Sequence, residues 1–175
     1  DEDGGFPREM LGKLAEQGFL GAPIPERWGG SGMDYLSFAL LCEELERADS
    51  AFRVVQSVHV GLNSLALLQW ATDEQRERWL VPQARGEKIA TFALTEPGVG
   101  TDAANLSATA RRDGDGYRLN GQKLWISLAD IADHFLVFAS TDRSKGWRGV
   151  TAFLLERGMA GLSTGTLHGK LGIRA

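Results

Sequence analysis

The chain has 175 residues, of which 43% are hydrophobic and 24% are charged, a balance typical of a globular protein with one core or two smaller ones. Its formal net charge is −4, and its lysines and arginines are scattered along the chain, which argues against nucleic acid or an anionic membrane as a partner. Its single cysteine excludes an internal disulfide framework and a cysteine-based metal site.

Neither a secretory leader nor a membrane-spanning helix is expected. The start, D-E-D-G-G-F-P-R, is acidic, and the apolar run 58–70 is interrupted by polar residues. Cys42 lies among leucines in a helical pattern, so we expect a buried core thiol and an intracellular, reducing compartment. The chain starts without methionine and ends in the middle of a β pattern, and we therefore expect it to be a truncated piece of a longer protein.

The N-terminal half has helical periodicity. Pro7 can serve as the first residue of a helix, and Gly18 supplies its C-terminal stop. Residues 21–34 contain two prolines and four glycines and are predicted to form a loop that packs over its neighbours. Asp34 is then expected to cap a second helix, which runs through Arg47 and divides into an apolar and an acidic face.

Asp49 or Ser50 is expected to open a third helix. Its apolar residues follow a period of about 3.6, so we expect this helix to be mostly buried. The positions that carry the pattern are Phe52, Val55, Val58, Leu62, Leu65 and Leu68. A fourth helix is predicted to begin at Thr72, which matches a capping box with Gln75, and to end near Gly86.

From Lys88 the hydrophobic period changes from about 3.6 to about 2, which predicts a helical domain over residues 1–87 and a β domain over residues 88–175. Several short strands at near-regular spacing are typical of an antiparallel sandwich or barrel. The expected strands are 88–95, 107–112, 116–119, 122–127, 134–141 and 149–156, with a last pair from Leu162 onward. The D-G dipeptide at 113–114 and the N-G dipeptide at 120–121 are expected to form hairpin turns.

The segment 88–102 reads K-I-A-T-F-A-L-T-E-P-G-V-G-T-D and passes from a strand into a glycine-rich loop. Gly98 and Gly100 let the backbone approach a ligand closely, and Thr95 and Thr101 supply hydroxyls suited to polar ligand atoms or phosphate oxygens. An ordinary Pro-Gly turn explains this spacing equally well.

A second segment, G-Q-K-L-W-I-S at 121–127, ends with an indole and a hydroxyl two residues apart. Together, T-E-P-G-x-G-T-D and N-G-x-K-x-W-I-S resemble the flavin-binding middle domain of the acyl-CoA dehydrogenase family. The resemblance covers essentially the whole chain. It implies an α+β protein with an N-terminal all-helical domain, then an antiparallel β-barrel or sandwich domain, and with the family's C-terminal helical domain absent.

A flavin ring requires an apolar or aromatic wall and short donors at its rim. On a strand, Trp125 and Ser127 would share one face and could cover the ring and reach its edge together, whereas a core tryptophan is the alternative. The resemblance implies that residues of both segments contact FAD: Phe92, Leu94, Thr95, Gly100, Thr101, Trp125 and Ser127. The family more often has Ser at the position of Thr101 and Thr at that of Ser127, and both exchanges keep the hydroxyl.

The resemblance further implies an enzyme of fatty acid metabolism, which oxidises an acyl-CoA to a 2,3-enoyl-CoA. A carboxylate base removes the α-proton, and the β-hydrogen leaves as hydride to flavin N5. The family's base lies on the C-terminal domain, so no catalytic residue is named and the chain alone is expected to be inactive. An electron-transferring flavoprotein is the implied electron acceptor and a homotetramer the implied assembly, in the bacterial cytoplasm or the mitochondrial matrix. A flavin monooxygenase or oxidase and a catalytically inactive acyl-CoA-binding fragment remain as alternatives.

Arg53 and Ser57 are four residues apart and therefore share a helical face. Solvent is the simplest partner for Arg53. However, D-S-A-F-R-x-x-x-S is similar to the glutaryl-CoA dehydrogenase branch, which implies that these two residues bind the terminal carboxylate of a dicarboxylic acyl-CoA. Thr101 is a further expected substrate contact. A short- or medium-chain acyl-CoA is the alternative substrate.

The other polar residues are interpreted as structural. Glu96 and Asp102 are expected to form hydrogen bonds within their turn. His59, His134 and His168 are far apart in sequence, without metal-ligand spacing or an adjacent nucleophile, so we expect structural or surface roles and no metal site.

Overall fold

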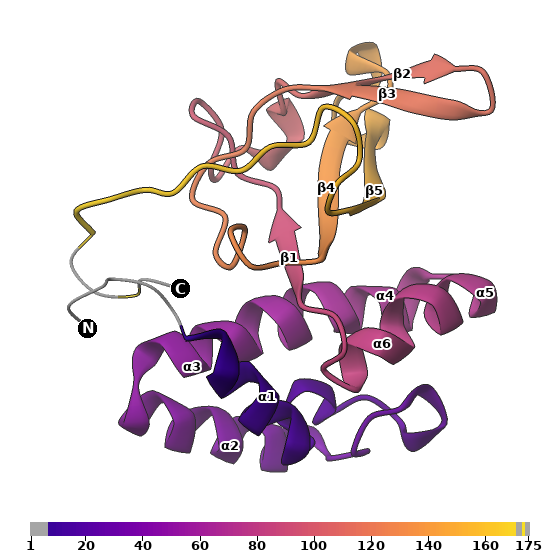
Figure 1. Ribbon diagram of the computed structural model, residues 1–175. Helices are drawn as coiled ribbons and strands as arrows, with labels where there is room; N and C mark the ends of the chain where they lie inside the picture. Colours follow the sequence, from indigo (N-terminus) through magenta and orange to yellow (C-terminus); the bar gives the residue numbers. More distant parts are fainter. Residues whose placement is uncertain (1–6, 171–172, 174–175) are drawn as a thin grey trace.

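The computed structural model describes residues 7–170 and residue 173, and it places a layer of helices below a five-stranded sheet (Figure 1). The helical elements are α1 (Arg8–Glu16), η1 (Phe19–Gly21), η2 (Glu26–Trp28), α2 (Tyr35–Ala48), α3 (Ser50–Val55), η3 (Gln56–Ser64), α4 (Leu65–Trp70), α5 (Asp73–Gln75), η4 (Arg76–Leu80) and α6 (Val81–Ala84). The second half contains β1 (Ala90–Ala93), η5 (Ala103–Asn105), β2 (Thr109–Asp113), β3 (Gly116–Asn120), β4 (His134–Ser140), η6 (Arg143–Gly149) and β5 (Val150–Glu156).

The first helix and the loop after it agree with the local sequence signals. Pro7 is the N-cap of α1 rather than its first residue, and Gly18 adopts φ 73° just after the helix ends. The loop packs over its neighbours as predicted, because Ile24 and Trp28 belong to a core cluster with Trp79 and other residues of the later helices. The N-terminal half is therefore helical, as expected.

Helix α2 is capped as predicted but is not buried. Asp34 Oδ1 accepts a hydrogen bond from the Ser37 amide at 2.7 Å. None of its residues is buried, and Leu36 and Leu40 are exposed. Cys42 is only half-buried, so the prediction of a buried core thiol is wrong: α2 packs mainly against α3, and Leu45 is its residue packed against the core cluster that contains Leu11. Partial burial still raises the pKa of the Cys42 thiol, and the positive charge of Arg53, which acts to lower this pKa, does not cancel the effect.

Elements α3, η3 and α4 form one continuous helix, Ser50–Trp70, whose middle section is a π-helix. Asp49 caps it as predicted, since its Oδ1 accepts from the Ala51 amide at 2.7 Å. The predicted apolar stripe is only partly correct, because a π-helix has more residues per turn than an α-helix: Val55 is buried, whereas Leu62 is 44% exposed. The face that is buried instead carries four polar residues, Gln56, His59, Asn63 and Ser64.

Among the described residues, Ser50–Trp70 is the one helix that is long and apolar enough to cross a membrane by length and composition alone. A core helix passes the same test. Here Asn63 donates to the Thr91 carbonyl at 2.7 Å, and His59 Nδ1 accepts from the Ala90 amide at 2.9 Å. Because these bonds join the helix to strand β1, we interpret it as a core helix.

The sheet is mixed and open. Strand β4 pairs in parallel with β1, where Ala90 lies opposite His134, and antiparallel with β5 along its whole length. Strands β2 and β3 form the predicted hairpin, with Gly114 at φ 59° in its turn, and β2 meets β4 in parallel. The expectation of an antiparallel barrel or sandwich is corrected accordingly for the described residues. The long connection 94–133 returns the chain to the starting end of β1, so β4 runs beside β1 in the same direction.

The expected strand 122–127 and the expected last pair of strands are absent from the described structure. Residues 122–127 form an irregular segment, in which Trp125 has φ 60°, a left-handed conformation that a strand does not contain. Position 121 requires glycine because its backbone lies close to that of Ala108: a Cβ at this position would be 2.7 Å from Ala108 Cα. Residues 162–170 also lack a strand, and the remainder of the predicted last pair falls largely outside the described residues.

Candidate functional site

The first predicted segment forms β1 and the turn after it. Thr91 and Ala93 are buried on one side of the strand, whereas Phe92 and Leu94 are half-buried on the other, where the Phe92 ring lies 4.9 Å from that of Phe138. Thr95, also half-buried, comes directly after this end of β1. The alternation places the two apolar candidates of this segment on the same face.

The glycine-rich part of the segment is an exposed, closed turn. Glu96 and Val99 exchange backbone hydrogen bonds of 3.0 and 3.1 Å. Gly98, Gly100 and Thr101 are exposed, and a Cβ added at either glycine would meet nothing within 4 Å. The protein's own packing therefore does not require glycine at these two positions, and their backbone is open to close approach.

The second predicted segment lines an open groove beside the sheet. Trp125 is 62% exposed, and both its indole and Ser127 border this groove. The two residues do not share the face of a strand, so that part of the prediction is wrong, although both reach the same depression. Leu119 and Ala93 line the same groove, and Phe92, Leu94, Thr95, Gly100 and Thr101 do not.

Hydrogen bonds hold the two segments side by side. The Leu124 amide donates to the Thr95 carbonyl at 2.9 Å, and Thr91 Oγ1 donates to the Ser127 carbonyl at 2.6 Å. Trp125 lies between these two attachment points. The structure therefore brings the T-E-P-G turn and the W-I-S loop together, although a β-hairpin separates them in the sequence.

Asp102 forms hydrogen bonds within its own turn, as predicted, whereas the prediction is wrong for the Glu96 carboxylate, whose partners lie 11 to 27 residues farther along the chain. The buried Glu96 carboxylate accepts from the amides of Ser107 at 2.5 Å and Ala108 at 2.9 Å, and from Lys123 Nζ at 2.8 Å. Burial acts to raise the pKa of Glu96, but the hydrogen bonds from Lys123, Ala108 and Ser107 outweigh it and lower the pKa. Asp102 accepts from the side chain and the backbone amide of Asn105.

Sequence reasoning missed Lys123. Its side chain is only 11% exposed, and its ammonium donates to Leu94 O and to Glu96 Oε1. Lysine is among the residue types that proteins bury least often, so composition alone did not indicate this position. The only signal was its place inside the N-G-x-K-x-W-I-S motif.

Arg53 and Ser57 are neighbours on the helix as predicted, with Nη1 to Oγ at 3.3 Å. Arg53 does not simply extend into solvent: its Nε donates to Glu46 Oε2 at 2.8 Å. Hydrogen bonds from Ser50 and then from Arg53 lower the pKa of Glu46. Neither Arg53 nor Ser57 lines the groove that contains Trp125.

The histidines have the structural or surface positions expected of them. The fully buried His59 ring accepts a hydrogen bond from the Ala90 amide, and its Nε2 lies 3.1 Å from the Gln83 carbonyl oxygen. Burial lowers the pKa of His59 to about 4. His134 is buried next to Gln83 Nε2 at 3.1 Å, and His168 is exposed. The described residues contain no group of three or more His, Cys, Asp or Glu side chains that could hold a metal ion.

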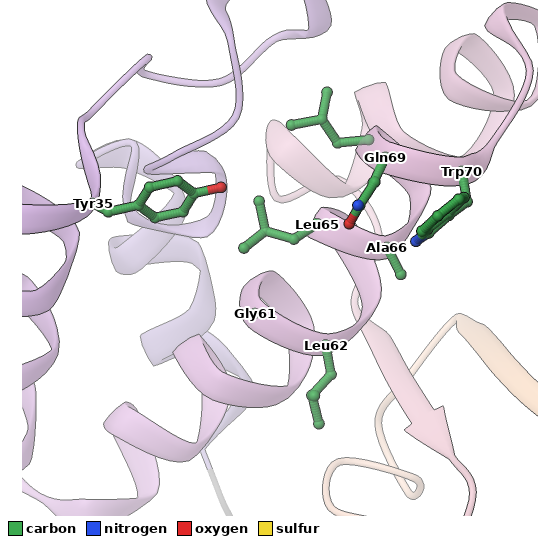
Figure 2. A pocket seen from close by; sticks show the side chains of 8 residues that line it. Tyr35, Gly61, Leu62, Leu65, Ala66, Gln69 and Trp70 are labelled. Carbon is green, nitrogen blue, oxygen red and sulfur yellow. The ribbon is translucent and has the colours of Figure 1, made fainter.

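A second depression lies on the helical side and was not predicted (Figure 2). Tyr35 at the start of α2 faces the turns around Leu62 and Leu65, and Gln69 and Trp70 border it farther along the same helix. Tyr35 is 70% and Trp70 79% exposed. Its lining is mainly apolar, which suits an apolar side chain or helix face rather than a charged ligand.

A helical domain followed by a sheet with an aromatic-walled groove defines a two-domain arrangement, and each part matches a known domain family. Residues 1–87 match "Acyl-CoA dehydrogenase, N-terminal domain", and residues 91–175 match "Acyl-CoA dehydrogenase, middle domain". The chain belongs to the acyl-CoA dehydrogenase family.

Individual relatives agree with this assignment. The short-chain specific acyl-CoA dehydrogenase of Clostridium acetobutylicum is 41% identical over 175 residues, which are 100% of this chain and 46% of that protein. Butyryl-CoA dehydrogenase from Megasphaera elsdenii superposes with a TM-score of 0.94 at 40% identity, over 99% of this chain and 46% of that one. A glutaryl-CoA dehydrogenase from Mycobacterium smegmatis, solved in complex with FADH2, superposes with a TM-score of 0.92 at 35% identity, over 99% of this chain and 44% of that one. The chain thus spans less than half the length of these relatives.

Proposed function

We propose that the protein containing this chain is an FAD-dependent acyl-CoA dehydrogenase, which converts an acyl-CoA thioester to a 2,3-enoyl-CoA. Family membership supports the enzyme class. The observation that carries the proposal is Trp125, which is 62% exposed and lines the groove. Its loop is hydrogen-bonded to the segment that follows β1. A flat ring stacked on this indole would bury its face.

The residues present fit FAD. Trp125 offers an apolar wall, Ser127 offers a hydroxyl in the same groove, and glycines 98 and 100 leave their backbone open to close approach. A relative solved with FADH2 supports the choice of cofactor. We assign the cofactor contacts to the residues predicted from the sequence: Phe92, Leu94, Thr95, Gly100, Thr101, Trp125 and Ser127. Trp125 and Ser127 line the groove, whereas the other five lie in β1 and the segment directly after it, which is hydrogen-bonded to the Trp125 loop beside the groove.

When bound, FAD supplies an acceptor for the hydride that leaves the substrate's β-carbon. The role of this chain's residues is to bind FAD and to orient it. Trp125 would cover a ring face and exclude water from it, Thr95 and Ser127 would donate hydrogen bonds at its polar edge, and the exposed amides around Gly100 and Thr101 would suit phosphate oxygens. The α-proton must go to a base, and we assign that role to no residue of this chain.

The acyl group has two candidates. Relatives named for short-chain acyl-CoA and butyryl-CoA support a short, uncharged chain. The arrangement of Arg53 and Ser57 supports a dicarboxylic acyl-CoA such as glutaryl-CoA, because a guanidinium and a hydroxyl 3.3 Å apart can both donate to one carboxylate once the Ser57 hydroxyl turns away from the Val54 carbonyl, to which it donates at 3.1 Å. Glu46 occupies part of the guanidinium fork, so a substrate carboxylate would share Arg53 with it.

The proposal extends to the partners. A relative from Acetobacterium woodii, 42% identical over 173 residues, is named as the CarC subunit of a caffeyl-CoA reductase-Etf complex, which supports an electron-transferring flavoprotein as electron acceptor. Curated relatives include bacterial proteins and mitochondrial proteins of mammals, so we propose the bacterial cytoplasm or the mitochondrial matrix as compartment. We also propose a homotetramer, on the basis of the family resemblance.

The full-length protein tests the proposal directly. We expect it to purify with FAD and, without oxygen, to lose its visible flavin absorption when butyryl-CoA or glutaryl-CoA is added. Electrons should then pass to an electron-transferring flavoprotein or a dye. A protein that binds no flavin would contradict the proposal. Reduced flavin that consumes oxygen rapidly in the presence of product would favour an oxidase.

A further inference from the structure

Lys123 lies at the centre of the contact between the two motif segments. Its Nζ donates to the Leu94 carbonyl at 2.9 Å and to Glu96 Oε1 at 2.8 Å. The side chains of Lys123 and Glu96 are 11% and 2% exposed, so this ion pair is almost completely removed from solvent. Its place in the interior distinguishes it from the chain's other described ion pairs, each of which has at least one partner more than 20% exposed.

Through Glu96, the lysine is attached to a third segment. The Glu96 carboxylate also accepts from the amides of Ser107 and Ala108, just before β2. Its pKa is lowered, so it is ionised at neutral pH, and the ammonium of Lys123 balances its charge. A buried ion pair adds little net stability compared with apolar residues, because desolvation offsets the attraction. The pair is therefore better explained by what it positions than by the stability it adds.

The residues directly after Lys123 in the chain require positioning. Leu124 donates its amide to the Thr95 carbonyl, and Trp125 then adopts φ 60° with its indole exposed. Residues other than glycine disfavour this left-handed backbone, so neighbouring contacts must maintain it. On the other side of Trp125, the Ser127 carbonyl accepts from Thr91, and Leu128 is buried.

We infer that Lys123 is a positioning residue for the proposed flavin site: it fixes the loop of Trp125 against the end of β1, so that the indole is in place before the cofactor binds. Lys123 acts through Leu94, Glu96 and the backbone of its own loop. The inference rests on the proposed function for its link to FAD. It does not depend on that function for its structural part, because the hydrogen bonds are made by the protein alone. Preorganisation of this kind improves affinity by removing the cost of ordering the loop on binding.

The test uses the full-length protein and two variants. Lys123→Met removes the ammonium, and the double variant Glu96→Gln/Lys123→Met also removes the carboxylate charge, so that no unpaired buried charge is left. FAD affinity is measured by titrating the apoprotein and monitoring the quenching of flavin fluorescence. Hydrogen exchange of the Leu124 amide, measured without FAD, reports the order of the loop. Arg78→Met is the matched control, because it removes the Arg78–Glu156 ion pair of 3.0 Å, neither residue of which lines the groove.

We expect both Lys123 variants to bind FAD about tenfold more weakly and to exchange the Leu124 amide about tenfold faster than the parent, with Arg78→Met unchanged in both measurements. Parental exchange and affinity in the double variant would overturn the inference, since the effect of Lys123→Met would then come from the unpaired Glu96. A parent that binds no FAD would overturn the proposed function. In that case, faster Leu124 exchange in the double variant would still support the positioning of the loop, and unchanged exchange would refute it.

Discussion

Asn63 and Thr91 join the helical part of the protein to its sheet: the side-chain amide of Asn63 donates to the Thr91 carbonyl at 2.7 Å. Both residues are fully buried. The Thr91 hydroxyl donates in turn to the Ser127 carbonyl at 2.6 Å. A continuous polar path therefore leads from the core helix, across β1, to the loop that carries Trp125.

Asn63→Ala should lower the free energy of unfolding by about 1–3 kcal/mol, because it removes a hydrogen bond between two fully buried residues. Chemical denaturation of the full-length protein measures this loss. The control is Asn105→Ala, which affects an exposed side chain bonded to Asp102 and should change stability by no more than about 0.5 kcal/mol. Losses of equal size in the two variants would contradict the assigned role of Asn63.

Stability should fall as the pH decreases from about 6.5 to about 4, because burial lowers the pKa of His59 from 6.5 to about 4. In this window the unfolded chain binds a proton that folded His59 does not bind. The free energy of unfolding therefore decreases by up to about 1.4 kcal/mol per pH unit for this one group. Above pH 6.5 the histidine is neutral in both states and its contribution is constant.

His59→Gln removes this titrating group. In that window, the free energy of unfolding of the variant should therefore depend less steeply on pH, by the equivalent of up to one bound proton. His134, whose pKa is also lowered by burial, contributes a slope of the same sign and is retained in both proteins. Denaturation midpoints at a series of pH values provide the measurement. Parallel curves for parent and variant would show that folding does not shift the pKa of His59, and would contradict the prediction.

Trp125→Ala should weaken FAD retention by about 1 kcal/mol or more, because it removes the aromatic wall of the groove. Flavin-to-protein absorbance ratios after dialysis of the full-length protein give the occupancy. Trp147→Ala is the matched control: Trp147 is 65% exposed, close to the 62% of Trp125, but lies in η6, away from the groove. Equal occupancy in the two variants would remove Trp125 from the cofactor site.

Arg53→Ala should separate the two candidate substrates. If Arg53 and Ser57 bind a terminal carboxylate, kcat/KM for glutaryl-CoA should fall roughly ten- to hundredfold, which corresponds to a loss of about 1.5–3 kcal/mol in transition-state stabilisation. The value of kcat/KM for butyryl-CoA should fall far less. Arg47→Ala is the control, since Arg47 forms ion pairs with Glu43 and Glu44 on the surface of α2. Equal losses on both substrates, or a parent without glutaryl-CoA activity, would leave a short- or medium-chain acyl-CoA as substrate.

Part of the site could be predicted from the sequence because it depends on residue type and spacing. The T-E-P-G turn and the W-I-S loop were identified by their motifs, and the structure places them side by side through Thr95 and Leu124. The buried partner of this contact, Lys123, was not found, because pattern analysis assigns a charged residue to the surface unless its partner is known. That partner, Glu96, is 27 residues away in the chain.

The sequence by itself determined the features whose cause is local. Asp34, Asp49 and Thr72 cap helices because each side chain bonds a backbone amide two or three residues ahead, and the D-G turn at 113–114 closes its hairpin for a similar reason. Only the tertiary structure decided the parallel pairing of β1 with β4, the polar buried face of Ser50–Trp70 and the left-handed backbone of Trp125. These features depend on contacts between residues far apart in the chain, and a hydrophobic period reports neither the direction in which a strand returns nor a π-helical turn.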